Sequence, residues 1–193
     1  MSAAERKDEL RRDLIRRRLE LGEDRRDRAD SAIAATAARL VSEFDFRIIA
    51  AFVVHRGEPD LKGLLEWLDA EERTVLLPVV RDLDMHFRRW TPESEMRANR
   101  YGIAEPVASE EFAPAQIDLV LMPLVGFAAN GARLGMGAGF YDRAFAFRHG
   151  RQDDLPRLVG VAYSVQEATS LPVDDWDVPL DGIITEKGLR WFG

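Results

Sequence analysis

The hydrophobic and polar positions along the chain change period several times, and each change marks a different element. Residues 5–21 carry leucine and isoleucine at the spacing of about 3.6 residues that is typical of an amphipathic helix, and Gly22 ends this pattern. Residues 25–44 repeat the helical spacing in an alanine-rich sequence. Residues 47–54 form a continuous apolar run with β-branched side chains, which predicts a strand buried on both faces. Strands of this kind are typical of a parallel sheet.

The alternation of strand and helix continues along the rest of the chain. Further helices are predicted at residues 60–70, with Asp60 as the N-cap, and at residues 140–148. The other apolar runs predict strands at residues 73–79, 85–90 (more exposed than the rest), 117–124, 157–163 and 182–184. Strand, helix and strand in repeated order require crossover connections, which give a mainly parallel sheet covered by helices on both faces. We therefore predict a three-layer α/β/α fold in a single domain over residues 1–193.

The composition is typical of a globular protein with a single buried core. The 193 residues are 46% hydrophobic, which is enough for one buried core. Lys and Arg number 27 against 34 Asp and Glu, and the net charge of −7 argues against a broad nucleic-acid-binding surface. The absence of cysteine excludes disulfides, thiolate zinc sites and cysteine nucleophiles. We expect a monomer that binds a small-molecule substrate and no nucleic acid.

No part of the sequence predicts a membrane segment. The longest nearly uncharged stretch, residues 117–132, is shorter than the roughly 20 apolar residues that a spanning helix needs. The N-terminus is charged and lacks the apolar region of a signal peptide. We therefore expect a cytoplasmic protein with no membrane contact.

Charge is distributed unevenly between the two ends of the chain. Residues 1–28 carry ten Lys or Arg against eight acidic residues, whereas residues 166–193 carry two against six. Such ends could lie on either side of a ligand that holds both phosphate and metal. Two separate, solvated helix faces are the simpler interpretation, and charge alone favours it.

The glycine-rich stretch between a predicted strand and a predicted helix carries the clearest chemical signal. In parallel sheets ligands bind beyond the carboxyl ends of the strands, which here means residues 55–60, 123–143 and 163–181. Within the second of these ranges, Gly135, Gly137 and Gly139 alternate just before the helix. Glycines at such a place permit positive φ and let backbone N–H groups approach an anion. Phosphate is the ligand that this arrangement favours.

The spacing of the glycines alone does not decide between a phosphate site and an ordinary tight turn. It matches neither the Walker pattern nor the dinucleotide fingerprint. Its neighbours favour phosphate, because Arg133 supplies a cation at one end of the loop and Asp142 a hard oxygen ligand at the other. A polyphosphate that carries Mg²⁺ needs this combination.

Several segments together resemble the 5-formyltetrahydrofolate cyclo-ligase family, also called methenyltetrahydrofolate synthetases. The sequence Gly131-Ala-Arg-Leu-Gly-Met-Gly-Ala-Gly-Phe-Tyr-Asp-Arg143 is similar to the family signature. Lys7-Asp-Glu-Leu-Arg11 resembles the family's N-terminal element, and Tyr101-Gly-Ile-Ala-Glu-Pro106 resembles its mid-chain motif. The stretch from Leu171-Pro172 through Asp177 and Asp181 resembles its acidic tail. The resemblance extends over nearly the whole chain.

The resemblance implies a reaction in which ATP phosphorylates the formyl oxygen of 5-formyltetrahydrofolate. N10 of the folate then attacks the activated carbon, and phosphate leaves to give 5,10-methenyltetrahydrofolate, ADP and phosphate. The residues implied to bind ATP are Lys7, Arg11, Arg133, Leu134, Gly135, Met136, Gly137, Ala138, Gly139, Phe140 and Tyr141. Those implied to bind the folate are Val53, Glu58 and residues 136–140. The implied Mg²⁺ ligands are Asp142 and Asp177, and the implied catalytic residues are Arg133 and Asp142.

The implied binding residues have plain structural interpretations as well. Lys7 and Arg11 lie four apart on one helix face, as many solvated pairs do. Asp177 and Asp181 could be turn and strand-cap residues, and Asp181 is the weaker metal ligand of the two. Glu58 could only solvate a loop, although a carboxylate there could also bind the amino and ring nitrogens of a pterin.

The aromatic and histidine side chains leave their roles open. Trp90, Tyr101 and Phe140 could stack on a ring of the ligand or belong to the core, and only Phe140 has the loop context in its favour. The scattered histidines are interpreted as surface or partly buried polar residues: His55, His86 and His149.

Two departures from the family pattern keep rival functions open. Ala138 stands where members often carry lysine, and Ala128 stands where an Asp is often found. A diverged, non-catalytic protein that binds folate or nucleotide is one alternative. A different ligation or sugar-phosphate reaction on the same fold is another, since α/β scaffolds serve many chemistries.

Overall fold

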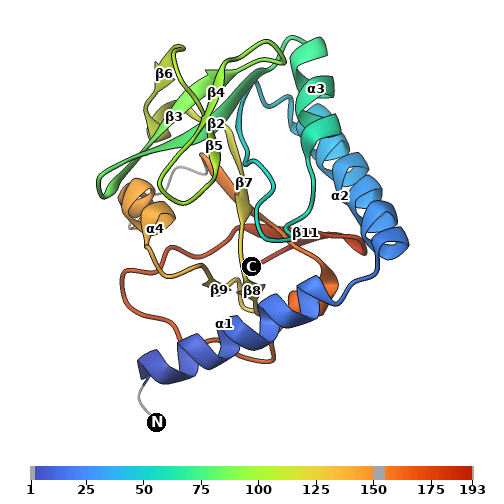
Figure 1. The fold of residues 1–193 in the computed structure, drawn as a ribbon, viewed down its shortest axis with the longest axis vertical. Coiled ribbons are helices and arrows are strands. Elements are labelled where there is room, and N and C mark those ends of the chain that lie inside the picture. Colours follow the sequence, from blue (N-terminus) through green and yellow to red (C-terminus); the bar gives the residue numbers. More distant parts are fainter. Residues whose placement is uncertain (1–2, 150–154, 193) are drawn as a thin grey trace.

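The computed structural model describes residues 3–149 and 155–192, and its centre is an eight-stranded sheet (Figure 1). The strand order is β12-β11-β10-β7-β1-β2-β3-β6. The parallel strands at its centre are β1 (Ile48–Ala50), β2 (Thr74–Arg81), β7 (Leu119–Pro123), β10 (Arg157–Val161) and β11 (Gly182–Thr185). Antiparallel strands complete both edges: β12 (Gly188–Trp191), β3 (Asp84–Trp90) and β6 (Glu111–Phe112). The predicted mainly parallel sheet is confirmed.

Helices cover both faces of this sheet. They are α1 (Ala3–Leu19), α2 (Glu23–Phe44), α3 (Lys62–Ala70) and α4 (Phe140–Ala144), with 3₁₀ turns η1 (Pro114–Gln116), η2 (Ala146–Arg148) and η3 (Ser164–Gln166). On one face α2 and α3 pack against Leu121, whereas on the other face Phe145, which follows α4, packs with the cluster around Met122. Leu121 and Met122, which are neighbours in β7, thus pack on opposite faces of the sheet, because side chains alternate along a strand. The three-layer α/β/α class is confirmed.

Several element boundaries differ from the predictions. The predicted strand at residues 47–54 pairs only as β1, because the chain leaves the sheet after Ala51, whose N–H still donates to the carbonyl of Leu76. The helix predicted at residues 140–148 stops at Ala144 and continues as a 3₁₀ turn. The N-cap of α3 is Leu61 rather than Asp60, whose carboxylate nevertheless accepts the N–H of Lys62 at 2.9 Å.

Four of the short strands outside the predicted set form two hairpins. The pair β4 (Met96–Ala98) and β5 (Ala104–Pro106) forms one hairpin, and β8 (Gly126–Phe127) with β9 (Arg133–Leu134) forms another. The predicted strand at residues 85–90 is β3, and its residues alternate between exposed and buried. These strands are too short to show a reliable period in the sequence.

Helix α1 crosses the carboxyl ends of the parallel strands (Figure 1). It packs on η3, which follows β10, and its Leu14 is 1% exposed in a cluster with Val125 and Leu134. Gly126 makes this docking possible, because a Cβ at that position would overlap with the Leu14 side chain. The first helix is therefore held at the edge of the sheet where ligands bind.

Leu14→Ala should lower the free energy of unfolding by about 2 to 5 kcal/mol, since it leaves a cavity under α1. Leu19→Ala is the matched control on the same helix, because Leu19 is 52% exposed and its truncation should change stability by about 0.5 kcal/mol or less. Urea unfolding of the three proteins measures both effects. An equal change in the two variants would contradict the docking of α1 through Leu14.

Candidate active site

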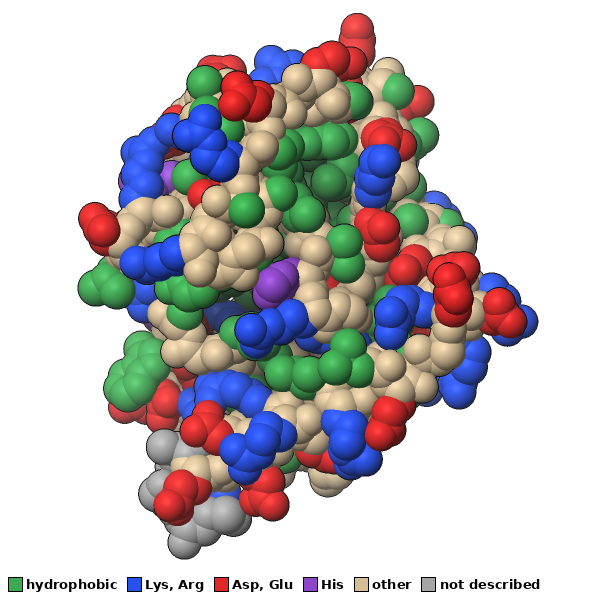
Figure 2. All heavy atoms as spheres, viewed as in Figure 1, with side chains coloured by type: hydrophobic (Ala, Val, Ile, Leu, Met, Phe, Trp, Pro, Cys, Tyr) green, Lys and Arg blue, Asp and Glu red, His purple; other side chains and the backbone are tan. Residues whose placement is uncertain are grey.

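A cavity of about 770 Å³ lies at the carboxyl ends of β1 and β7. Figure 2 shows hydrophobic side chains gathered in a recess at the centre of this face, with charged side chains around it. Every predicted site residue lines the cavity: Lys7, Arg11, Val53, Glu58, Asp177 and residues 133–142. The fold therefore brings together segments from both ends and the middle of the chain. Their individual roles stay predictions.

The glycine loop adopts backbone conformations that only glycine takes easily. Gly137 has φ +99° and Gly139, the residue before α4, has φ +66°. Arg11 donates from Nε to the carbonyl of Gly135 at 2.9 Å, and a Cβ on Gly137 would lie 3.4 Å from the Arg11 guanidinium carbon. At the other end of the loop, Arg143 donates to the carbonyl of Ala138 at 2.9 Å. Two arginines from separate helices thus hold the loop by its carbonyl groups.

Asp142 forms the charged wall next to this loop. Its Oδ1 accepts a hydrogen bond from Arg133 at 2.5 Å and another from the N–H of Val178 at 3.1 Å. Both side chains are largely buried, at 6% exposed for Arg133 and 16% for Asp142. The sequence placed these two residues at opposite ends of the loop, whereas the fold joins them in an ion pair.

Lys7 connects the N-terminal helix to the acidic C-terminal segment. Its Nζ lies 2.6 Å from Asp174 and 3.4 Å from Asp177, and the N–H of Asp174 donates to the same carboxylate of Asp177 at 2.9 Å. Burial by itself would lower the pKa of Lys7, but the hydrogen bond and charge of Asp174 together with Asp177 raise it. The basic and acidic ends therefore meet at the cavity wall, a contact that the charge pattern did not predict.

Asp142, Asp174 and Asp177 place carboxylate oxygens at this wall, and the predicted metal ligands among them are Asp142 and Asp177. Val178, whose N–H binds Asp142, directly follows Asp177 in the chain, so the two carboxylates belong to neighbouring segments. Within residues 3–149 and 155–192, no three acidic or histidine side chains are close enough to form a metal site by themselves. Mg²⁺ commonly uses one or two carboxylates and completes its shell with water and substrate phosphate. The donor set therefore fits a magnesium ion that binds together with a polyphosphate.

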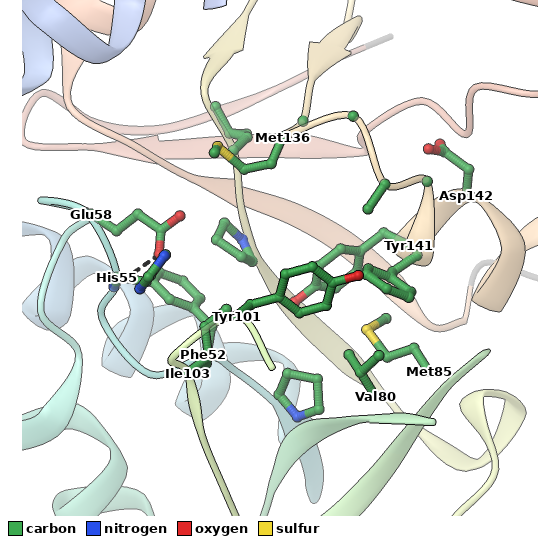
Figure 3. Close-up of a pocket in the computed structure, with 18 of the residues that line it drawn as sticks. Phe52, His55, Glu58, Val80, Met85, Tyr101, Ile103, Met136, Tyr141 and Asp142 are labelled. Atoms are coloured by element: carbon green, nitrogen blue, oxygen red, sulfur yellow. Dashed lines mark hydrogen bonds between the residues drawn. The ribbon is translucent and has the colours of Figure 1, made fainter. Parts of the chain in front are cut away.

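Glu58 lies on the opposite side of the cavity from Asp142 (Figure 3). It is 8% exposed, its Oε2 accepts the N–H of His55 at 3.1 Å, and its Oε1 lies 3.9 Å from the Nη1 of Arg18. Burial raises the pKa of Glu58 to about 7, although Arg18 and the His55 N–H act in the other direction. Burial and the charge of Glu58 raise the pKa of the Tyr141 hydroxyl, so this hydroxyl stays protonated at neutral pH. The site thus combines a titratable carboxyl with a hydroxyl donor.

Two hairpins supply much of the remaining cavity wall. Pro78, Val80 and Met85 of the β2–β3 hairpin, with residues 99–101 and 103–105 of the β4–β5 hairpin, line one side (Figure 3). Tyr101 packs edge-on against Phe140 with 5.9 Å between ring centroids, so both aromatic residues belong to the cavity. Trp90, in contrast, is 9% exposed and lies in the core. The mid-chain motif already marked residues 101–106 in the sequence, whereas no local signal marks Pro78, Val80 and Met85, because only the tertiary fold brings them to the cavity.

The contacts of Asp181 bear on the two roles, strand cap or metal ligand, that the sequence left open for it. Asp181 accepts the N–H of Leu158 and a hydrogen bond from Arg148 at 2.7 Å, as expected of a strand-cap residue. It does not line the cavity. Asp181 therefore has a structural role.

Comparisons with known proteins identify the family. A family model described as the 5-formyltetrahydrofolate cyclo-ligase family matches residues 3–186. The chain belongs to the 5-formyltetrahydrofolate cyclo-ligase family. A 5-formyltetrahydrofolate cyclo-ligase of Haemophilus influenzae is 31% identical over 185 residues, covering 93% of this chain and 97% of the relative. The protein of that name from Escherichia coli K12 is 36% identical over 149 residues, covering 74% and 80%.

Solved structures of family members share the fold. The 5,10-methenyltetrahydrofolate synthetase of Aquifex aeolicus aligns with a TM-score of 0.82 at 32% identity, covering 96% of this chain and 92% of its own. That of Mycoplasma pneumoniae aligns with a TM-score of 0.75 at 28% identity, covering 93% and 98%. The chain is therefore an enzyme of the ligase class with a folate-related role. None of the helices in the described part of this family member is long and apolar enough to cross a membrane.

Glu58→Gln should change how stability depends on pH. The pKa of this carboxyl rises from 4.5 to about 7 on folding, so between these values the native protein binds more protons than the unfolded chain, and wild-type stability falls as pH rises. The amide in the variant does not ionise. The free energy of unfolding of the variant should therefore rise, relative to that of the wild type, by up to about 3 kcal/mol over this interval.

Thermal and urea unfolding between about pH 4 and pH 8 measure this difference. Glu43→Gln is the matched control, since Glu43 is exposed on α2, and it should follow the wild type at every pH. A constant difference between Glu58→Gln and the wild type would contradict the burial-driven pKa.

Proposed function

We propose that the chain converts 5-formyltetrahydrofolate to 5,10-methenyltetrahydrofolate, using ATP and Mg²⁺ and releasing ADP and phosphate. The observation that carries this proposal is one cavity with two different ends. A glycine loop flanked by cations lies at one end, and a buried carboxyl group within apolar walls lies at the other. The names of the family and of its relatives support the same reaction.

The loop end is suited to the phosphates of ATP. Gly137 and Gly139 with positive φ allow a close backbone approach, and Lys7, Arg11 and Arg133 place positive charge around the same wall. Asp142 and Asp177 would hold Mg²⁺, which supplies charge stabilisation for the transferring phosphoryl group when bound. Arg133 and Lys7, which pair with these carboxylates, line the same cavity and would add positive charge beside the phosphates.

The other end is suited to the folate. The ionised carboxylate of Glu58 can accept hydrogen bonds from the amino group and ring N–H of a pterin. Phe52, Tyr101 and Ile103 supply apolar and aromatic surface for the ring system. Residues 136–140 lie between the two ends and would contact both substrates. The arrangement brings the formyl group toward the terminal phosphate.

The chemistry requires positioning and charge stabilisation rather than a protein nucleophile. The formyl oxygen bonds to the γ-phosphorus of ATP while the bond to the leaving ADP oxygen breaks. N10 then bonds to the formyl carbon, the carbon–oxygen bond breaks, phosphate leaves with that oxygen, and the N10 proton passes to solvent. Cations next to the loop stabilise the charge on the phosphoryl group, and the attack of N10 is intramolecular. This route needs no cysteine, in agreement with the sequence.

Purified protein should form the methenyl product, seen by its absorbance, and release ADP only when ATP, Mg²⁺ and 5-formyltetrahydrofolate are all present. A coupled ADP assay run beside the absorbance measurement tests this. Binding of both ligands in calorimetry without ADP release would instead favour a non-catalytic binding protein.

Asp142→Asn should lower kcat/KM by about 100-fold, because it removes charge from the metal-binding wall while its remaining oxygen still accepts from Val178. Asp175→Asn is the matched control in the same acidic segment, since Asp175 is exposed and does not line the cavity. Steady-state kinetics of both variants decide the point. Unchanged turnover in Asp142→Asn would refute its role.

Gly137→Ala should raise the KM for ATP about tenfold, since an L-residue at this positive φ costs about 1 to 2 kcal/mol and pushes against Arg11. Gly63→Ala on α3 is the control, because a Cβ there meets nothing within 4 Å and a helix gains stability from alanine. Kinetics with varied ATP at saturating folate separate the two. Equal KM values in both variants would contradict the role of the loop.

A further inference from the structure

Arg18 is a fully buried arginine that directly follows two solvated ones. Arg16 and Arg17, the two residues before it on the same helix, are 63% and 48% exposed and pair with Asp13. Arg18 is 0% exposed, although charged side chains are almost never buried without a reason. Burial lowers the pKa of its guanidinium, while the charge of Glu58 opposes this effect. The position of this cation therefore needs an explanation.

The donors of Arg18 connect the ends of two central strands. Nη2 donates to the carbonyl of Arg56 at 2.8 Å, in the turn that follows β1, and Nη1 donates to the carbonyl of Leu124 at 3.3 Å, directly after β7. Gln166 donates to the same Leu124 carbonyl at 3.0 Å. The guanidinium thus fixes the 55–58 turn against the end of β7.

The same guanidinium is the positive charge that faces Glu58 from α1. Its Nη1 lies 3.9 Å from Oε1 of Glu58, too long for a hydrogen bond but close enough for a strong electrostatic effect in a buried place. The other groups around Glu58 are the N–H of His55 in its own turn and the hydroxyl of Tyr141 from α4. Burial, with the charges of Arg56 and Arg18, lowers the pKa of the His55 imidazole, so this ring is neutral near pH 7.

We propose that Arg18 is a positioning residue for Glu58, the carboxyl group proposed to bind the folate: it holds the 55–58 turn in place and favours the ionised form of that carboxyl. The effect on Glu58 is a property of the free protein, whereas its consequence for folate binding rests on the function proposed above. A residue that is named by no sequence motif would then set the pH range in which the folate end of the cavity works.

The test measures the titration of Glu58 directly in the full chain. Carboxyl ¹³C NMR of glutamate-labelled protein, with Glu58→Gln to assign the signal, gives the pKa without any substrate. Arg18→Met should raise the pKa of Glu58 by about 1 to 3 pH units, because it removes an opposite charge within 4 Å. Arg18→Gln also removes the charge but retains an amide donor for the carbonyl groups. It replaces Arg18→Met in the same titration if Arg18→Met does not fold.

Kinetics then connect this titration to catalysis. In both charge-removing variants the acid limb of kcat/KM for 5-formyltetrahydrofolate should move to higher pH, with about a fivefold loss at pH 7 for the first pH unit of the rise and about a tenfold loss for each further unit. The KM for ATP should stay at the wild-type value. Arg18→Lys keeps the charge but loses the planar guanidinium that donates to two carbonyl groups at once. It should therefore leave the Glu58 titration in place and raise the KM for the folate several-fold.

Arg17→Met is the matched control on the same helix, since Arg17 is 48% exposed, and it should match the wild type in every measurement. In the Glu58→Gln background, Arg18→Met should no longer move the pH profile. A folded charge-removing variant with an unchanged Glu58 titration would overturn the electrostatic role, and a wild-type folate KM in Arg18→Lys would overturn the positioning role. Lack of turnover in the wild type would refute the proposed function alone, since the NMR titration needs no substrate.

Discussion

The docking of α1 across the carboxyl ends of the parallel strands is the constraint on which the rest of the site depends. Leu14 packs where Gly126 leaves room for it, and Arg18 reaches the carbonyl groups beyond β1 and β7. Once the helix is held there, Lys7 and Arg11 necessarily project onto the cavity from the same face. This helix adds little to the main core, yet it supplies two of the cations that line the cavity.

Charge within the cavity is balanced mainly by internal pairs. Arg133 pairs with Asp142, and Lys7 pairs with Asp174 and Asp177. Each pair sets a cation beside a carboxylate at the cavity wall, so neither charge is left alone in a largely buried place. Glu58 differs from these acids, because its nearest cation lies at 3.9 Å and burial dominates its ionisation.

Parts of the fold were predicted correctly where the local pattern and the tertiary environment agree. Helices α1 and α2 and the buried strands β7, β10 and β11 fall close to the predicted ranges. The prediction for residues 47–54 was wrong at its C-terminal end, since an apolar run looks the same whether it pairs in a sheet or lines a cavity. Phe52 and Val53 belong to the cavity wall.

The sequence by itself determined the class of fold, the glycine loop and the set of segments that form its charged wall. Periodicity and glycine conformation act over a few residues, and a one-dimensional pattern records them. Only the tertiary structure decided that Arg18 is buried while Arg16 and Arg17 are solvated, that Lys7 contacts Asp174 and Asp177, and that residues of two hairpins close the cavity. These contacts join residues far apart in the chain, and their energies depend on burial and distance, which no local pattern contains.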